Sequence, residues 1–159
     1  MTQDVEEDRE RLDRNWDDLL QELRVAQTGV QLLTGLLLTV PFQARFAELS
    51  DQQRTVYLVV ASLSVFAAGL LITPVVLHRV LFRLNARETL VAAGQRFALA
   101  GFAVLGLAVV GVITLIFDIV LGGPAAVIAG VVAFVVISAL WAVGPIALRR
   151  ANARDRPTG

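Results

Sequence analysis

Residues 97–120, FALAGFAVLGLAVVGVITLIFDIV, contain a single charged side chain, that of Asp118, and they decide the fold class. The stretch is longer than the roughly 20 helical residues that cross the hydrocarbon core of a bilayer. Further apolar stretches lie at residues 25–40, 56–77 and 124–148. The sequence therefore predicts an all-α integral membrane protein whose residues 24–150 form a four-span helix bundle.

The basic residues indicate how the spans are oriented. All 14 are arginines, and only Arg45 and Arg54 lie between the first and second stretches. The other twelve lie before the first stretch, between the second and third, or after the fourth. Because arginine-rich loops tend to stay in the cytoplasm, we expect both termini to be cytoplasmic. The polar residues 151–159 are then expected to form a disordered cytoplasmic tail.

Residues 1–23 form a separate acidic segment, with nine acidic side chains and three arginines. Its apolar residues recur at helical spacing and share one face of an amphipathic helix; they are Leu12, Trp16, Leu19, Leu20 and Leu23. A helix that lies on a membrane surface is normally basic, because it meets anionic headgroups. We therefore expect this cytoplasmic helix to dock on protein.

A basic face beyond the second span is one candidate for that contact. Its arginines are four residues apart and share one side of a continued helix; they are Arg79, Arg83 and Arg87. The acidic side chains of the N-terminal segment have a similar spacing. The alternative is that both charged faces are solvated, since exposed ion pairs contribute only about 0–1 kcal/mol each.

Polar residues form a stripe along the first span, at steps that place them on one helical face. The stripe consists of Arg24, Gln27, Thr28, Gln31 and Thr34. Because amide side chains are costly in lipid, we expect the stripe to face the bundle interior or a water-filled cavity. One interpretation is a polar conduit or small-molecule site. The other is hydrogen bonding between helices, worth about 0.6 kcal/mol per bond on average.

Three ionisable residues near the span ends are candidates for proton or cation binding. Glu22 lies at the inner end of the stripe, His78 follows the second span, and Asp118 lies near the outer end of the third. For each of them, the alternative is an interfacial residue that anchors its helix. The chain has no cysteine and one histidine, and it lacks a nucleophile–base pair or nucleotide-binding motif. We therefore expect no catalytic residue, metal, cofactor or nucleic-acid partner, and no enzymatic activity.

Small residues recur at multiples of four along the fourth span, at Gly122, Ala126, Gly130, Ser138 and Ala142. Such a face allows helices to approach closely, either within the chain or between copies of a homo-oligomer. The alternative is that the pattern only reflects an alanine-rich composition.

The two halves of the chain also align as an internal repeat. Residues 24–29 match residues 96–101, and residues 74–79 match residues 145–150. Each half would be a helical hairpin that starts on the same side of the membrane, as in parallel repeats.

The segments ELRVAQTGVQLL (22–33), LLLTVPFQARFAEL (36–49) and QRTVYL (53–58) resemble those of a known family. Over residues 16–150 the chain is similar to small four-span membrane proteins of actinobacteria grouped as domain of unknown function 6328. The resemblance implies a protein of a bacterial cytoplasmic (inner) membrane without an assigned role. Some members carry a sodium/proton antiporter label. Antiporters of known mechanism use more spans and paired membrane-embedded acids, whereas here no acidic residue lies in the middle of a span.

Two functions remain open. The first is a non-enzymatic membrane protein with a structural or accessory role, whose spans contact the lipid bilayer. The second is a small oligomeric transporter or channel for protons, cations or a small solute, which would use the polar stripe of the first span.

Overall fold

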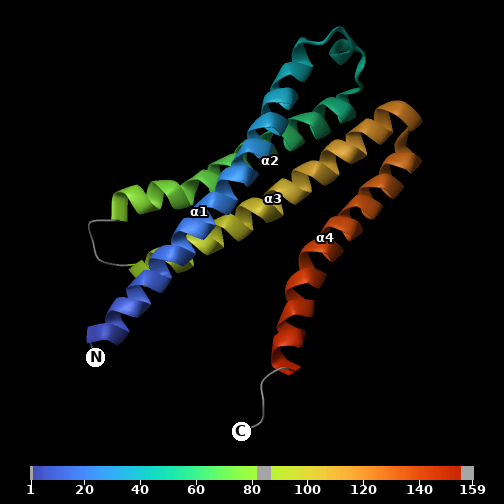
Figure 1. Cartoon of the computed structure of the whole chain (residues 1–159). Coiled ribbons are helices and arrows are strands. Elements are labelled where there is room, and N and C mark those ends of the chain that lie inside the picture. Colours follow the sequence, from blue (N-terminus) through green and yellow to red (C-terminus); the bar gives the residue numbers. More distant parts are fainter. Residues whose placement is uncertain (1, 82–86, 155–159) are drawn as a thin grey trace. The chain divides into compact units, whose positions relative to one another are not determined.

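The computed structural model describes residues 2–81 and 87–154, and all regular structure in these ranges is helical. The elements, of which η1 and η2 are 3-10 helices, are α1 (Thr2–Thr39), η1 (Val40–Phe42), η2 (Ala44–Glu48), α2 (Asp51–Leu81), α3 (Arg87–Leu121) and α4 (Gly123–Arg154) (Figure 1). Each of the four α-helices contains a stretch that is long and apolar enough to cross a membrane. The predicted all-α fold with four spans is therefore confirmed.

The acidic segment and the first span are a single helix. α1 runs from Thr2 to Thr39 without a break, and no proline interrupts this range. The helix ends just before Pro41, because a residue that precedes a proline is disfavoured in the α conformation. The chain then continues as η1, with Pro41 near its start. The boundary predicted at residue 23 is thus a change of composition within one helix.

The other element ends also differ from those expected. The segment between the first two spans has helical spacing in the sequence and forms two 3-10 helices, η1 and η2. α4 extends to Arg154, so residues 151–154 of the predicted disordered tail are helical. Alanine and arginine in this stretch favour helix. Residues 155–159 lie outside the described part of the chain.

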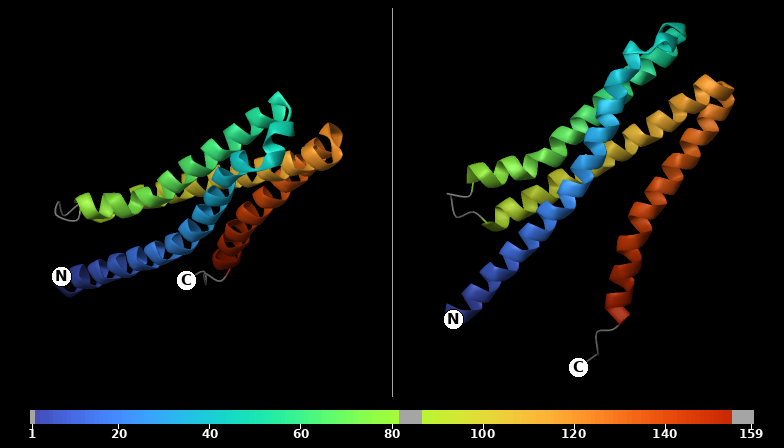
Figure 2. Two further views of the ribbon diagram at one scale, coloured as in Figure 1. Left: turned by 90° about the horizontal axis from the view of Figure 1, so that it is seen from above. Right: turned by 45° about the horizontal axis from the view of Figure 1, so that its top comes forward.

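α1 and α2 form an antiparallel hairpin and pack against each other; they lie side by side near their connecting loop in every view (Figures 1 and 2). α1 buries Leu23, Val30 and Leu37, which are 1%, 0% and 7% exposed. α2 buries a matching row at alternating steps of three and four, namely Tyr57, Val60, Ser64, Ala67, Leu71 and Pro74. This spacing is typical of helix pairs that cross at a small angle.

The chain divides into two compact units, residues 1–108 and 109–159. In the first unit, Ala98 of α3 joins Leu23, Val30 and Leu71 in one core cluster. Gly101 allows this close approach, because a Cβ atom at that position would lie 2.8 Å from Cγ of Leu71. The first half of α3 thus packs against the hairpin through small residues.

In the second unit, α3 turns into α4 at Gly122, whose φ of +92° is a conformation that other residues rarely adopt. Gly130 of α4 is buried, and Oγ1 of Thr114 on α3 occupies the space that a Cβ at Gly130 would need. Part of the small-residue face of the fourth span therefore packs within the chain. Ser138 of that face is exposed, and the side chain of Ala142 lies outside the described part.

Candidate functional site

The candidate site follows the polar residues of α1 and begins with a hydrogen bond to α2. Nε2 of Gln27 donates to the backbone carbonyl oxygen of Leu71 at 2.8 Å. The side chain of Leu71 is fully buried in the core cluster, so this bond lies beside the buried core of the hairpin. Gln27 is therefore part of the contact between the two helices.

Pro74 gives a physical reason for a donor at this place. It is buried in α2, three residues after Leu71. A proline has no N–H, and its ring crowds the carbonyl four residues earlier, which here is that of Leu70. In membrane helices, neighbouring side chains commonly restore hydrogen bonding near such a proline. The amide of Gln27 supplies a donor to the carbonyl adjacent to the disturbed one.

Thr34 lies on the same side of α1 as Gln27. Its Oγ1 atom is buried, and it has no hydrogen-bond partner within residues 2–81 and 87–154. We call this side of α1 the packing face; it consists of Leu23, Ala26, Gln27, Val30, Thr34 and Leu37, all of which are buried or half-buried. Two of the five predicted stripe residues belong to it.

The other three stripe residues, Arg24, Thr28 and Gln31, are exposed. Oγ1 of Thr28 donates to the carbonyl oxygen of Arg24 in its own helix at 3.0 Å. Gln31 makes no hydrogen bond to any described residue. The predicted stripe is thus divided between two sides of α1. Gln27 and Thr34 lie toward the hairpin contact, and for the exposed three the expectation of a bundle interior or a water-filled cavity stays a prediction.

A second hydrogen bond joins the helices at the loop end of the hairpin. The hydroxyl of Tyr57 on α2 donates to the carbonyl oxygen of Leu37 on α1 at 2.6 Å. The Tyr57 ring also meets the ring of Phe46 in η2 edge to face, with centroids 5.2 Å apart. These contacts, together with the Gln27 bond, fix the register of α1 against α2.

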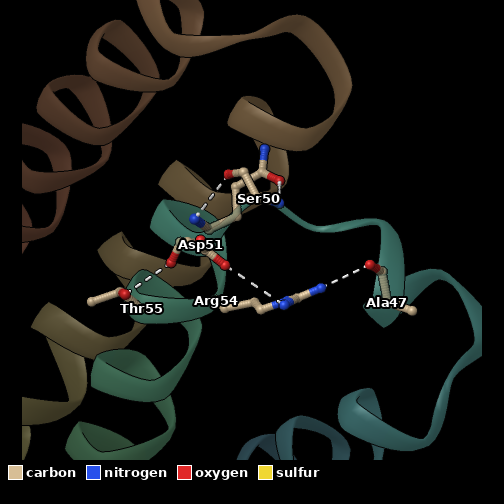
Figure 3. A network of polar contacts seen from close by, with 6 residues as sticks. Ala47, Ser50, Asp51, Arg54 and Thr55 are labelled. Atoms are coloured by element: carbon tan, nitrogen blue, oxygen red, sulfur yellow. Dashed lines mark hydrogen bonds and ion pairs between the residues drawn. The ribbon is translucent and has the colours of Figure 1, made fainter.

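A polar network at the start of α2 holds the connecting loop (Figure 3). The backbone N–H of Gln53 donates to Oγ of Ser50 at 3.2 Å, and the backbone N–H of Ser50 donates to Oε1 of Gln53 at 3.1 Å. This reciprocal pair is a capping box, which satisfies donors that the first helical turn leaves open. The sequence analysis missed it, although serine followed three residues later by glutamine is the signal that predicts it.

Arg54 extends this network from the helix to the loop. Its Nη2 atom donates to the carbonyl oxygen of Ala47 at 2.8 Å, and its Nη1 atom lies 3.6 Å from Oδ1 of Asp51 (Figure 3). Arg54, one of the two arginines between the first two spans, therefore stabilises the connecting loop. The network organises the connecting loop.

Two of the predicted ionisable sites are described, Glu22 in the first unit and Asp118 in the second. Glu22 and Arg79 are exposed. Asp118 is half-buried, and its Oδ1 atom lies 3.8 Å from the place of a Cβ at Gly123, the first residue of α4. A carboxylate is favourable near a helix N-terminus because the helix dipole is positive there. The cation-site and interfacial interpretations of Asp118 both stay predictions.

The remaining predicted positions lie outside what the structure describes, namely Arg83 as a whole and the side chains of His78 and Arg87. Among the described residues, no three histidine, cysteine, aspartate or glutamate side chains are grouped as a metal site would require.

The comparison with family models finds a match over residues 5–145, to a family of unknown function, DUF6328. The chain belongs to the DUF6328 family. The matched range contains the packing face of α1, the exposed stripe residues Arg24, Thr28 and Gln31, and the turn at Gly122. Membership of DUF6328 was predicted from the resemblance and is confirmed. Comparisons with curated proteins and with solved structures found no match.

Proposed function

We propose that this chain is a non-enzymatic membrane protein with a structural or accessory role. The observation that supports this proposal is the hydrogen bond from Gln27 to the carbonyl of Leu71. The polar side chain of Gln27 in the first span thus serves helix packing, as interhelical hydrogen bonds commonly do in membranes. A polar group engaged in this way is not free to bind a solute.

Cysteine accessibility tests this role, because the chain has no cysteine of its own. Single variants Gln27→Cys and Thr34→Cys place a thiol on the packing face, and Glu48→Cys places one on the exposed connecting loop as a control. In native membranes, we expect an aqueous maleimide to label Glu48→Cys and to leave both packing-face variants unmodified. Labelling of those two at the rate of the control would show a water-filled path and would contradict the structural role.

A second function, a small oligomeric transporter or channel for protons, cations or a small solute, is supported by one observation. Gln31 is exposed on a membrane-spanning helix and has no hydrogen-bond partner among the described residues. Such polar residues often mark a substrate or ion pathway. A flux in reconstituted vesicles that is lost in Gln31→Leu and kept in Leu32→Ala would support transport; equal flux in both variants and in empty vesicles would exclude this role for Gln31.

The acidic N-terminal part of α1 is proposed to dock on the basic face formed by Arg79, Arg83 and Arg87. Opposite charge supports this contact, since residues 1–23 hold nine acidic side chains. Reversal of Arg83 to glutamate should lower the thermal stability, and reversal of one acidic partner to arginine should restore it. Failure of rescue at every acidic position of residues 1–23 would exclude the contact.

A further inference from the structure

The side of α1 next to the packing face carries a row of polar and small residues. It consists of Arg24, Thr28, Gln31 and Gly35, and we call it the exposed polar face. All four residues are exposed, and a Cβ at Gly35 would meet no atom within 4 Å. Their steps of four, three and four keep them on one side of the helix, as in the seam of a left-handed helix pair. All four lie within the membrane-spanning stretch Leu20–Phe42.

The amide of Gln31 makes this face unstable against lipid alone. A polar group in hydrocarbon costs several kcal/mol when it has no hydrogen-bond partner. Thr28 does not incur the same cost, because its hydroxyl already donates to the carbonyl of Arg24. Gln31 therefore requires a neighbour that both donates and accepts hydrogen bonds.

The described polar side chains of the other spans are mostly engaged. Four hydroxyl groups donate to backbone carbonyls, namely those of Tyr57, Ser64, Thr73 and Thr114. Gln27 donates to the carbonyl of Leu71. A second Gln31 is a better complement, because a primary amide offers two donors and one acceptor oxygen. Two copies related by a two-fold axis can each donate to the other and accept in return.

We propose that the exposed polar face of α1 binds a second copy of this chain. The two α1 helices lie parallel about a two-fold axis along the membrane normal, with Gln31 opposite Gln31 of the other copy. Gly35, one turn further, allows the backbones to approach closely, as small residues do at helix contacts in membranes. Arg24 lies near the end of the span, where its long side chain extends toward the headgroups, so that the two guanidinium groups separate.

The contact between copies thus lies on α1 and not on α4. The sequence suggests a homo-oligomer through the small residues of the fourth span. Gly130, in the middle of that row, is already buried against Thr114 of the same chain. On α1, in contrast, Gly35 has open space above it. Gly35, which has open space above it, and the exposed amide of Gln31 therefore lie on the same face of α1.

Disulfide cross-linking of single cysteines in native membranes tests the contact, because the natural chain contributes no thiol. The test variants are Gln31→Cys and Gly35→Cys. The matched control is Gly29→Cys, since Gly29 is also exposed with no atom within 4 Å of a Cβ. It lies about 120° away from Gly35 around the helix. On mild oxidation, we expect covalent dimers in both test variants, several-fold above the level in the control.

The possible outcomes distinguish what covers the exposed polar face: a second copy, water, lipid or another part of the same chain. Equal dimer in all three variants would indicate random collision and would overturn the proposal. Gln31→Cys that forms no dimer and reacts quickly with an aqueous maleimide would overturn it in favour of a water-lined pathway. A thiol that is inert to both treatments would place lipid or another part of the same chain on the face. Dimer at Ser138→Cys alone would place the contact on α4.

A second measurement distinguishes loss of the dimer contact from misfolding of the monomer. Replacement of Gln31 by leucine in the Gly35→Cys background should reduce cross-linking several-fold, because the paired amides are lost. The thermal unfolding midpoint of the reduced monomer should stay unchanged, since the described residues of the chain make no hydrogen bond to Gln31. Undiminished cross-linking in this variant would show that the amides do not hold the contact.

Discussion

Gln27 and Gln31 are one helical turn apart on α1 and have different surroundings. Gln27 is half-buried and donates to the carbonyl of Leu71, whereas Gln31 is exposed. Both have the same chemistry, so the difference comes from the side of α1 on which α2 packs. The glutamine that reaches α2 stabilises the hairpin, and the exposed one beside it requires a partner from elsewhere.

The first prediction concerns this hairpin bond. Gln27→Leu removes the donor to the carbonyl of Leu71 and should destabilise the protein by about 1 kcal/mol, within the range of interhelical hydrogen bonds in membranes. Thr28→Ala is the matched control, because that hydroxyl bonds only within its own helix. The measurement is the thermal unfolding midpoint in detergent. Equal midpoints for the two variants would show that the Gln27 bond contributes nothing.

The second prediction concerns the close approach of α3 to the hairpin. Gly101→Ala places a Cβ atom 2.8 Å from Cγ of the buried Leu71 and 3.3 Å from Cβ of Leu70. Overpacking of this kind costs roughly 1–3 kcal/mol. Gly69→Ala is the control: its Cβ would meet nothing within 4 Å, and alanine favours a helix interior by about 0.5–1 kcal/mol. We expect the midpoint to fall in the first variant and to stay or rise in the second.

At the scale of elements, the turn between α3 and α4 depends on Gly122. Its φ of +92° is strained for any residue with a Cβ, at a cost of about 1–3 kcal/mol. Gly122→Ala should therefore destabilise the protein. Gly123→Ala should be nearly neutral, because its nearest contact would be Oδ1 of Asp118 at 3.8 Å. Unfolding in detergent of the two variants provides the measurement, and a larger loss at Gly123 would contradict this assignment.

The sequence predicted the four spans well because length and apolar composition suffice for that task. It could not predict how the polar stripe divides, since Thr34 and Thr28 lie at the two edges of an arc of roughly 120°. Which edge meets α2 depends on the register of the hairpin. That register rests on contacts distant in sequence, from Gln27 to Leu71 and from Tyr57 to Leu37. Periodicity within one helix does not contain this information.

At the scale of the whole molecule, charge and apolar composition describe different properties. The four apolar stretches establish that the chain has helices suited to cross a membrane. The orientation of the spans in the membrane is predicted from the uneven distribution of the arginines, because this distribution acts while the chain inserts. Helix packing alone does not reveal the orientation. Direction is thus a separate prediction, and it has its own test.

We predict that both termini and the α2–α3 connection lie in the cytoplasm, and that the α1–α2 connection lies outside. Twelve of the 14 arginines support this orientation, and Arg45 and Arg54 are the two exceptions. In intact cells, a membrane-impermeant maleimide should label Glu48→Cys and should not label Thr2→Cys or Thr158→Cys. All three should react once the cells are permeabilised. Labelling of either terminal cysteine in intact cells, with Glu48→Cys protected, would reverse the orientation and would place the basic face on the outer side.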